Sequence, residues 1–506
     1  MSFSSIRRAM FVFAGLALGA LVVQADDGWL PATPQKLPRW RGFNIQNKYM
    51  LGTNQKPFEE ADFKIIHDLG FNFVRLPMDY RIWIKDGDWT QIDEHKAFDD
   101  LDQVMQWAAK YQIHVCMNFH RAPGYTVAQP PESRSLWTDP EAQRVCALHW
   151  AAFARHFKGI PPERLSFDLF NEPHDVDEAT YLKVVTMMVN AIRQEDPQRL
   201  IIADGLDWAN KPCPSLAPLG IAQSVHCYQP LLVTHYHASW VGGSDKFPVP
   251  EWPLVTSNIY LCGPDHPELR QPLTITGDFP AGTKLDLVVE AVSREGHLVV
   301  RADGQTVLEK NYTSGPQASE PGEQVVYLAQ YNLYQNVFNQ AQSVTLSQPA
   351  KEIALSCVDG DWISLGAVNV TVNGATYALP LQKNWGTPEA TIAFDPGHPD
   401  QPWSTPDAMD GAWLWQHNLV PWQQLQNQGV GVMVGEWGCF HFTPYAVTLR
   451  WMEDNLKNFQ RAGWGWALWN LYGGFGLLDS DRPGAVYEDY EGHKLDRRMY
   501  ELLQKY

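Results

Sequence analysis

The sequence has few basic residues relative to acidic ones, and this shortage excludes two classes of partner. Lys and Arg number 39 against 57 Asp and Glu, which gives a formal net charge of −18 at pH 7. A protein with this balance repels the phosphates of nucleic acid and the headgroups of an anionic membrane. We therefore expect neither as a partner. The charge says nothing positive about a neutral ligand.

The spacings that mark metal and phosphate sites are also missing. The seven cysteines are odd in number, and no two of them form the C-x-x-C pair of zinc sites. Gly473, Gly474 and Gly476 lie close together, but no helix start follows them, as a phosphate-binding loop requires. The sequence thus predicts no metal and no cofactor.

The N-terminal segment has the pattern of an export signal. Arg7 and Arg8 precede the apolar residues 9–23, and Val-Gln-Ala at 23–25 resembles a signal peptidase site. The apolar segment is too short for a comfortable bilayer span. We predict a signal peptide over residues 1–25 and a secreted or periplasmic protein with no membrane attachment after cleavage. We expect the mature protein to be a monomer.

Export to an oxidising compartment would allow one or two disulfides. The candidate pairs are Cys262 with Cys357 and Cys213 with Cys227. The odd number of cysteines leaves at least one thiol unpaired within the chain.

Apolar residues are abundant, and their periodicity indicates an α/β fold. They make up 45% of the 506 positions, enough for more than one core. From Trp40 onward, short apolar segments alternate with segments of helical period, such as the face formed by Phe58, Ile65 and Leu69. Eight such strands with intervening helices predict a (β/α)8 TIM barrel. The expected strands are residues 42–44, 73–76, 114–118, 165–170, 200–203, 224–227, 431–435 and 465–469.

One distance along the chain does not fit a plain barrel. Glu172 and Glu436, at the ends of the fourth and seventh expected strands, are 264 residues apart (436 − 172). Three units of a barrel of about 250 residues should take only roughly 95. Between the two acids, helical periodicity gives way to alternation, and Asp303-Gly304 and Asn373-Gly374 suit two-residue hairpin turns. The predicted organisation is a first barrel part at 26–257 with six strands, an inserted all-β sandwich at 258–383, and a second barrel part at 384–506 with two strands.

The same two acids stand where TIM barrels do their chemistry, at the carboxyl ends of strands. Glu172 follows the apolar segment 165–170, and Pro173 ends ladder pairing directly after it. Glu436 follows the β-rich segment 430–434. Cleavage of a glycosidic bond with retention needs one protonated acid at the leaving oxygen and one ionised acid at the anomeric carbon.

Other polar and aromatic side chains fall on the same expected rim. An arginine and a tyrosine hydroxyl beside the nucleophile would keep it ionised, and an asparagine would bond the sugar 2-hydroxyl. An indole face would support the apolar side of a sugar ring. Each residue alone would more often be an ion-pair partner, an interior histidine or a packing residue, so only their joint placement favours function. These residues are Arg75, His120, Asn171, His226, Tyr228 and Trp469.

The motifs around these residues resemble, in their order along the chain, those of glycoside hydrolase family 5, a family of retaining (β/α)8 glycosidases. The resemblance covers residues 40–252 and 403–506. The motifs are Arg75-Leu76-Pro77, Asn118-Phe119-His120-Arg121-Ala122-Pro123-Gly124, Phe170-Asn171-Glu172-Pro173, His226-Cys227-Tyr228 and Gly435-Glu436-Trp437-Gly438.

By this resemblance Glu172 is the acid/base and Glu436 the nucleophile. Trp469 matches the floor of the cleavage subsite, and the other five residues named above match supporting positions. His235 and Tyr236 offer a second His-aromatic pair near the sixth strand, so that match stays open.

The resemblance implies a retaining hydrolase of β-linked polysaccharide or oligosaccharide, with an endo-β-1,4-glucanase (a cellulase) as the leading expectation. A mannanase, a xyloglucanase or a β-1,3-glucan hydrolase stays open. So does a polysaccharide-binding protein whose barrel has lost activity, although the presence of both acids argues against it. The inserted region looks like a carbohydrate-binding module. Within it, Trp362 and Trp385 would form either a binding platform or part of the packing, and we expect packing for both.

Overall fold

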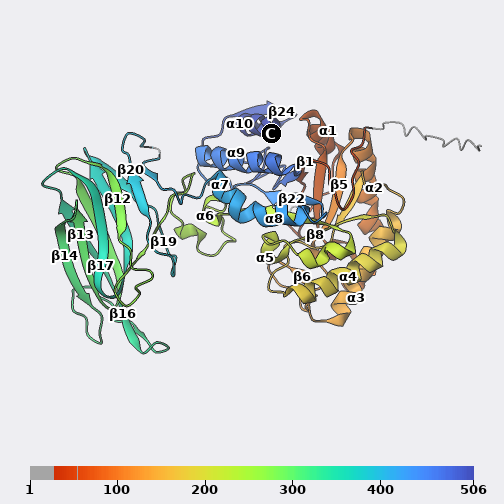
Figure 1. Cartoon of the computed structure of the whole chain (residues 1–506). Helices are drawn as coiled ribbons and strands as arrows, with labels where there is room; N and C mark the ends of the chain where they lie inside the picture. The colour runs from red at the N-terminus through yellow and green to blue at the C-terminus, as the bar shows by residue number, and fades with distance from the viewer. Residues whose placement is uncertain (1–27, 54, 400) are drawn as a thin grey trace, which may run out of the picture.

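Eight parallel strands of the described chain close into a barrel, which confirms the predicted fold class (Figure 1). The computed structural model describes residues 28–506 except residues 54 and 400, so the predicted signal peptide lies outside the described residues. Pairing of β2 with β5 closes the ring. The barrel strands are β1 (Arg41–Asn44), β2 (Phe73–Asp79), β5 (His114–Ala122), β7 (Leu165–Asp168), β8 (Leu200–Asp204), β9 (Ala222–Cys227), β22 (Val432–Trp437) and β23 (Trp466–Leu468).

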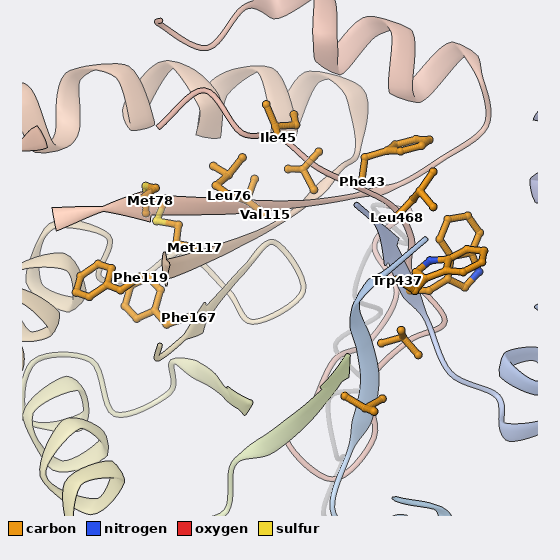
Figure 2. Close-up of a cluster of buried hydrophobic side chains, with 14 of the residues drawn as sticks. Phe43, Ile45, Leu76, Met78, Val115, Met117, Phe119, Phe167, Trp437 and Leu468 are labelled. Atoms are coloured by element: carbon orange, nitrogen blue, oxygen red, sulfur yellow. The ribbon is translucent and has the colours of Figure 1, made fainter. Parts of the chain in front are cut away.

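Helices cover the outside of the barrel, and one apolar core lies between them and the strands. Figure 2 shows Leu76, Met117 and Phe167, which β2, β5 and β7 contribute to this core. Among the described residues, no helix combines the length and apolar character that a membrane crossing requires. The helices are α1 (Glu60–Asp68), α2 (Glu94–Tyr111), α3 (Pro140–His156), α4 (Glu178–Glu195), α5 (Leu206–Ala209), α6 (Leu231–Thr234), α7 (Gly411–Leu414), α8 (Val420–Gln426), α9 (Tyr445–Ala462) and α10 (Arg497–Lys505).

The alternation of side chains along each strand places a second set of residues inside the barrel. Phe73, Cys116 and Ile202 belong to a small apolar cluster that is separate from the outer core. Two positions further along β2 and β8, on the same inward face, come Arg75 and Asp204. The polar side chains of the predicted site therefore form the layer above this apolar floor, towards the carboxyl ends of the strands.

A second, all-β domain lies beside the barrel, and its main sheet contains ten strands of the described chain (Figure 1). Strand β13 pairs with β16 before Gly296 and with β14 along the segment that contains it, and Gly296 itself pairs with Gly360 of β17. A Cβ on Gly360 would lie 2.2 Å from the carbonyl oxygen of Glu295, so this crossing requires glycine. Side chains from both halves of β13 share one buried core, so the sheet folds over as a sandwich. The domain's strands are β10 (Ser257–Asn258), β11 (Tyr260–Cys262), β12 (Leu273–Phe279), β13 (Lys284–Ala302), β14 (Gln305–Thr313), β15 (Tyr327–Leu328), β16 (Leu333–Thr345), β17 (Ala350–Val372), β18 (Ala375–Ala378), β19 (Leu381–Gln382), β20 (Thr391–Phe394) and β21 (Trp403–Ser404).

Both hairpin turns expected in this region are present. Asp303-Gly304 joins β13 to β14, and Asn373-Gly374 joins β17 to β18. The φ angles are 43° and 78° in the first turn and 50° and 82° in the second. A two-residue turn of type I′ needs positive φ at both positions, which Gly adopts freely and Asn and Asp tolerate.

The all-β domain extends beyond residue 383, the boundary expected from the sequence. Strand β20 pairs with β12, and β21 pairs with β20, so the sheet continues to Ser404. Phe394 and Trp403 from these strands are buried in the domain's core. The two strands are short and lie among prolines and glycines, a composition that resembles a barrel loop. The segments that connect the domain to the barrel meet at an antiparallel bridge between Leu254 and Met409.

All seven cysteines lie among the described residues, and each is a free, buried thiol. The suggested disulfides Cys213–Cys227 and Cys262–Cys357 are therefore not formed. The Cys213 sulfur instead lies 3.3 Å from a serine hydroxyl, and the Cys357 sulfur lies 3.1 Å from a backbone carbonyl. The chain packs these thiols as small apolar side chains.

Candidate active site

The barrel topology brings all eight predicted site residues to one rim. Parallel strands of a closed barrel end on the same side, so residues that are far apart in the sequence become neighbours there. Arg75, His120, His226 and Glu436 lie on β2, β5, β9 and β22, while Asn171 and Glu172 follow β7, Tyr228 follows β9 and Trp469 follows β23.

A bulge at Gly435 turns Glu436 towards the barrel interior. Val434 belongs to the outer core, and a regular strand would send Glu436, two positions later, to the same outer side. The register between β22 and β9 instead shifts after Val434, so that Glu436 pairs with His226. A Cβ on Gly435 would lie 2.3 Å from the hydroxyl oxygen of Ser224, so the bulge requires glycine.

Arg75 connects the acids and amides of the site. Its guanidinium donates hydrogen bonds to Glu436 Oε1 (2.5 Å), Asp168 Oδ2 (2.9 Å), Asn171 Oδ1 (2.9 Å) and Asn44 Oδ1 (3.1 Å). Burial disfavours the cation, but the attraction of Asp168 and Glu436 outweighs burial and raises the pKa of Arg75 above its ordinary value. Because each bond fixes one direction of a planar group, Arg75 determines where the Glu436 carboxylate lies.

His226 lies between the two predicted catalytic acids. Its Nδ1 is 2.8 Å from Glu172 Oε1 and 3.7 Å from Glu436 Oε2, and its Nε2 is 3.3 Å from Asp204 Oδ2. Burial disfavours the imidazolium, yet Asp204 and Glu436 attract it and raise the pKa of His226 well above its ordinary value. The ring is therefore positively charged at neutral pH and balances part of the negative charge around it.

The carboxylates of Glu172 and Glu436 are close together. One oxygen of each lies within 4.8 Å of the other and of a ring nitrogen of His226. Paired catalytic carboxyl groups stand about 5–5.5 Å apart in retaining glycosidases and about 6.5–9.5 Å apart in inverting ones. The Glu172 side chain is 16% exposed and that of Glu436 is 5% exposed. An oxygen–oxygen distance of at most 4.8 Å lies on the retaining side of these two ranges.

The pKa of Glu436 is raised, although we expected its neighbours to favour the ionised form. Arg75 does favour ionisation, as does His226, but burial and the charge of Glu172 outweigh them. The Tyr228 hydroxyl donates a hydrogen bond to Glu436 Oε2 at 3.0 Å. Once ionised, a carboxylate in this environment has few water molecules around it. Hydrogen-bond donors of the protein stabilise its negative charge instead.

Trp469 and His120 form an aromatic wall beside the acids. Their rings are stacked with centroids 5.5 Å apart and planes inclined by 18°, and Tyr49 contacts both edge-on. Burial and the charge of Arg75 lower the pKa of His120 to about 3, so this ring is neutral. Trp469 is partly exposed, which leaves indole surface available to a ligand.

Among the predicted site residues, three buried nitrogens have no hydrogen-bond partner in the described chain. They are Nδ2 of Asn171, Nδ1 of His120 and Nε2 of His226, although the last lies within ion-pair distance of Asp204. Since Arg75 occupies Asn171 Oδ1, the asparagine presents its amide donor to the site. An unpaired buried polar atom costs about 1–3 kcal/mol, and a hydroxyl-rich ligand would remove that cost.

Residues 31–252 match the family model of cellulases, glycosyl hydrolase family 5. This stretch of 222 residues (252 − 31 + 1), less than half of the chain, is similar to glycosyl hydrolase family 5. It includes Glu172 and five of the other seven predicted site residues, whereas Glu436 and Trp469 lie beyond it.

Two curated relatives align with part of this chain at 27–30% identity. Endoglucanase C of Acetivibrio thermocellus is 30% identical over 186 residues, which is 36% of this chain and 53% of that protein. Cellodextrinase A of Ruminococcus flavefaciens is 27% identical over 193 residues, which is 36% of this chain and 54% of that protein. The chain thus spans about half the length of these relatives.

Solved structures align with nearly the whole chain. The crystal structure of a glycoside hydrolase is 26% identical, with a TM-score of 0.60, over 92% of this chain and 99% of that one. Thermotoga maritima Cel5A in complex with cellobiose and with mannotriose aligns with 92% of this chain and 97% of its own, at 15% identity and TM-scores of 0.51 and 0.52. At that identity the Cel5A structures support the fold alone.

Three buried polar residues of the barrel rim were missed in the sequence. Asn44 donates a hydrogen bond from Nδ2 to the carbonyl of Gly435 (3.0 Å) and so holds the bulge, while Asp168 and Asp204 pair with Arg75 and His226. The expected fourth strand ran past Asp168, and the expected fifth stopped one residue before Asp204. A polar residue on the inward face at a strand end is the signal that would have found all three.

The alternative pair near the sixth strand does not replace His226 and Tyr228. His235 packs edge-on against Tyr228, with ring centroids 5.1 Å apart, and hydrogen-bonds the hydroxyl of Thr234 at 2.9 Å. His226 and Tyr228 themselves contact the acids. His235 therefore supports the position of the tyrosine.

Glu172, His226 and Glu436 are also a possible set of metal ligands, with one ligand atom from each within 4.8 Å. A metal binds the neutral imidazole, so a metal at this cluster would have to displace the proton that the raised pKa of His226 favours.

Proposed function

We propose that this protein is an exported retaining glycoside hydrolase that cleaves β-linked polysaccharide as an endo-β-1,4-glucanase. The observation that carries the proposal is the separation of Glu172 and Glu436, whose nearest oxygens lie within 4.8 Å on the rim of the barrel. Export rests on the predicted signal peptide over residues 1–25.

In the first step, Glu172 gives its proton to the leaving glycosidic oxygen while Glu436 attacks the anomeric carbon. The bond between carbon and leaving oxygen breaks, and an ester between the sugar and Glu436 forms. In the second step Glu172 takes a proton from water, whose oxygen attacks the same carbon and releases Glu436. Two inversions at one centre retain its configuration.

The neighbouring residues support these steps by position and charge. Arg75 and Tyr228 each donate to a different oxygen of Glu436, so the carboxylate is oriented and its departing charge is stabilised in the second step. Asn171 Nδ2 is free to bond the sugar 2-hydroxyl. Trp469 forms the floor under the sugar ring, stacked on His120.

The relatives named above as an endoglucanase and a cellodextrinase favour β-1,4-glucan as the substrate. Mannan, xyloglucan and β-1,3-glucan are the alternative substrates that the resemblance to family 5 leaves open. Product analysis after incubation with carboxymethylcellulose, glucomannan, xyloglucan and β-1,3-glucan separates these substrates.

The mechanism is tested with a 2-deoxy-2-fluoro-β-cellobioside that carries a good leaving group. The fluorine slows the second step, so we expect the intact chain to gain the mass of one 2-fluorocellobiosyl group and peptide mapping to find the label on Glu436. The Glu436→Gln variant should remain unlabelled, and the Glu172→Gln variant should be labelled when the leaving group needs no proton. A label on another residue, or binding without turnover of every glycan, would overturn the proposal.

A further inference from the structure

The all-β domain, which lies between the two predicted catalytic acids in the sequence, contains a large hollow. Its volume is about 970 Å³, within the range of about 300–1,000 Å³ that is usual for ligand sites. It lies where strands β13, β16 and β17 meet the segments around Tyr260, His266 and Trp385. None of the predicted catalytic residues lines it.

Exposed aromatic rings line this hollow. Trp385 is 50% exposed and Tyr331 is 64% exposed, which is unusual for side chains of this size. Trp385 is nevertheless held in place, because Tyr260 and His266 both contact it edge-on at 5.1 Å and Trp362 lies 6.1 Å away. We expected Trp362 and Trp385 to pack. Trp362 does, but it serves to fix Trp385, whose surface remains open to solvent.

Polar side chains stand between the aromatic rings. His266 Nε2 is 2.7 Å from Asp361 Oδ1, and Asp361 is itself almost fully buried. Asp265 and Arg294 form a looser pair at 3.5 Å on the exposed side. Donors and acceptors are therefore fixed at several points of the wall, next to the flat faces of the aromatic rings.

The charges in the hollow nearly cancel. Asp265, Glu290 and Asp361 are acidic, while Arg294 and Lys383 are basic. A near-neutral wall does not select an anion or a cation. Aromatic faces combined with hydrogen-bonding groups fit a neutral ligand that has both apolar faces and many hydroxyls.

We propose that this hollow is a second glycan-binding site, which binds a segment of a β-linked polysaccharide and does no chemistry. Trp385 stacks on a sugar ring, and the paired side chains around it bind the hydroxyls. The identity of the glycan as the barrel's own substrate rests on the proposed function. Binding there would keep the barrel close to an insoluble polymer and raise the local concentration of cleavable bonds.

The test uses the full chain and compares the Trp385→Ala variant with Tyr327→Ala. Tyr327 is an equally exposed aromatic residue of the same domain that does not line the hollow. Loss of an aromatic anchor should weaken adsorption to insoluble cellulose, or to mannan, by about tenfold in Trp385→Ala and leave Tyr327→Ala unchanged. Hydrolysis of a short aryl β-cellobioside should be the same in both variants, because this substrate is bound by the barrel alone.

Unchanged adsorption of Trp385→Ala on every glycan, or equal losses in both variants, would overturn the second site. The Tyr331→Ala variant repeats the comparison if Trp385→Ala fails to fold, because Tyr331 is mostly exposed. The two proposals fail separately. A chain that hydrolyses no glycan but loses adsorption in Trp385→Ala refutes the enzyme and supports the binding site, and the opposite result refutes only the binding site.

Discussion

Arg75 Nη1 donates a hydrogen bond to Glu436 Oε1 at 2.5 Å, although the two residues are 361 positions apart in the chain. The contact joins the second and seventh barrel strands across the barrel interior. It depends on the bulge at Gly435, without which Glu436 would point into the outer core. The all-β domain is inserted between these two residues and leaves the contact intact.

Replacement of Arg75 by Met should reduce both activity and stability. Asp168 and Glu436 would stay buried without their shared cation, and such a loss costs about 3–5 kcal/mol. The pKa of Glu436 should rise further, because the attraction that lowers it is gone. Urea unfolding and the pH dependence of kcat/KM would measure the two effects.

The matched control is Arg121→Met. Arg121 is equally buried and pairs with Glu132 at 2.5 Å, away from the acids. It should lose stability without any shift of the pH profile. If Arg75→Met keeps the wild-type profile, Arg75 does not control the ionisation of Glu436.

Replacement of Tyr228 by Phe should slow the reaction and shift the acidic limb of the pH profile of kcat/KM. The hydroxyl donates to Glu436 Oε2, and loss of one such donor costs about 10²–10³ in kcat. Because the ionised Glu436 is the reactive form and loses a donor, its pKa rises and the acidic limb of kcat/KM moves to higher pH. Tyr472→Phe, which loses a hydroxyl bonded to Asp62 at 2.7 Å, should leave the limb in place. A Tyr228→Phe enzyme with wild-type kcat at all pH values would contradict the role.

Glu389 should make the stability of the all-β domain depend on pH. Burial raises the pKa of this carboxyl to about 8, despite hydrogen bonds from Ser257 and the backbone of Asn258. A raised pKa means that the folded state binds the proton more tightly than the unfolded state. This contribution to stability is present below the unfolded pKa of about 4.5 and is lost as pH rises through about 8, at up to about 1.4 kcal/mol per pH unit.

Denaturant unfolding at pH 5, 7 and 9 checks this expectation. The wild-type protein should lose stability over this range, and Glu389→Gln should lose less because glutamine does not titrate. Glu352→Gln, on the exposed side of β17, serves as the control. Identical slopes for the wild type and Glu389→Gln would exclude Glu389 as the titrating group.

Gly435→Ala should disable the enzyme, and a second substitution should partly restore it. The new methyl would lie 2.3 Å from Ser224 Oγ, so the bulge must shift and Glu436 loses its position. Ser224→Ala removes that oxygen, which has no hydrogen-bond partner among the described residues, and the next contact is then 3.2 Å to His226 Nε2. We expect measurable recovery of kcat/KM in the double variant. Gly366→Ala in β17, whose nearest contact would be 3.5 Å, should be neutral.

The barrel was predictable because its signals are local. Each strand is a short apolar segment bounded by polar residues or turns, and seven of the eight predicted site residues lie in motifs at strand ends. Asp168 and Asp204 were missed because their role depends on which face of the strand they occupy. Side chains alternate between the two faces, so an error of one residue in the predicted strand assigns them to the wrong face. The late boundary at Ser404 was missed for a similar reason, since two-residue and four-residue strands leave almost no periodic pattern.

By itself the sequence determined the fold class, the presence of an insertion, the hairpin turns and the two acids. These follow from periodicity, turn chemistry and motifs that act over a few residues. Only the tertiary structure decided that Glu436 points inward, that His226 carries charge between the acids, that the thiols stay unpaired and that Trp385 faces solvent. Each of these depends on distances between segments hundreds of residues apart, and such distances are set by the closure of the barrel and the folding over of the sandwich.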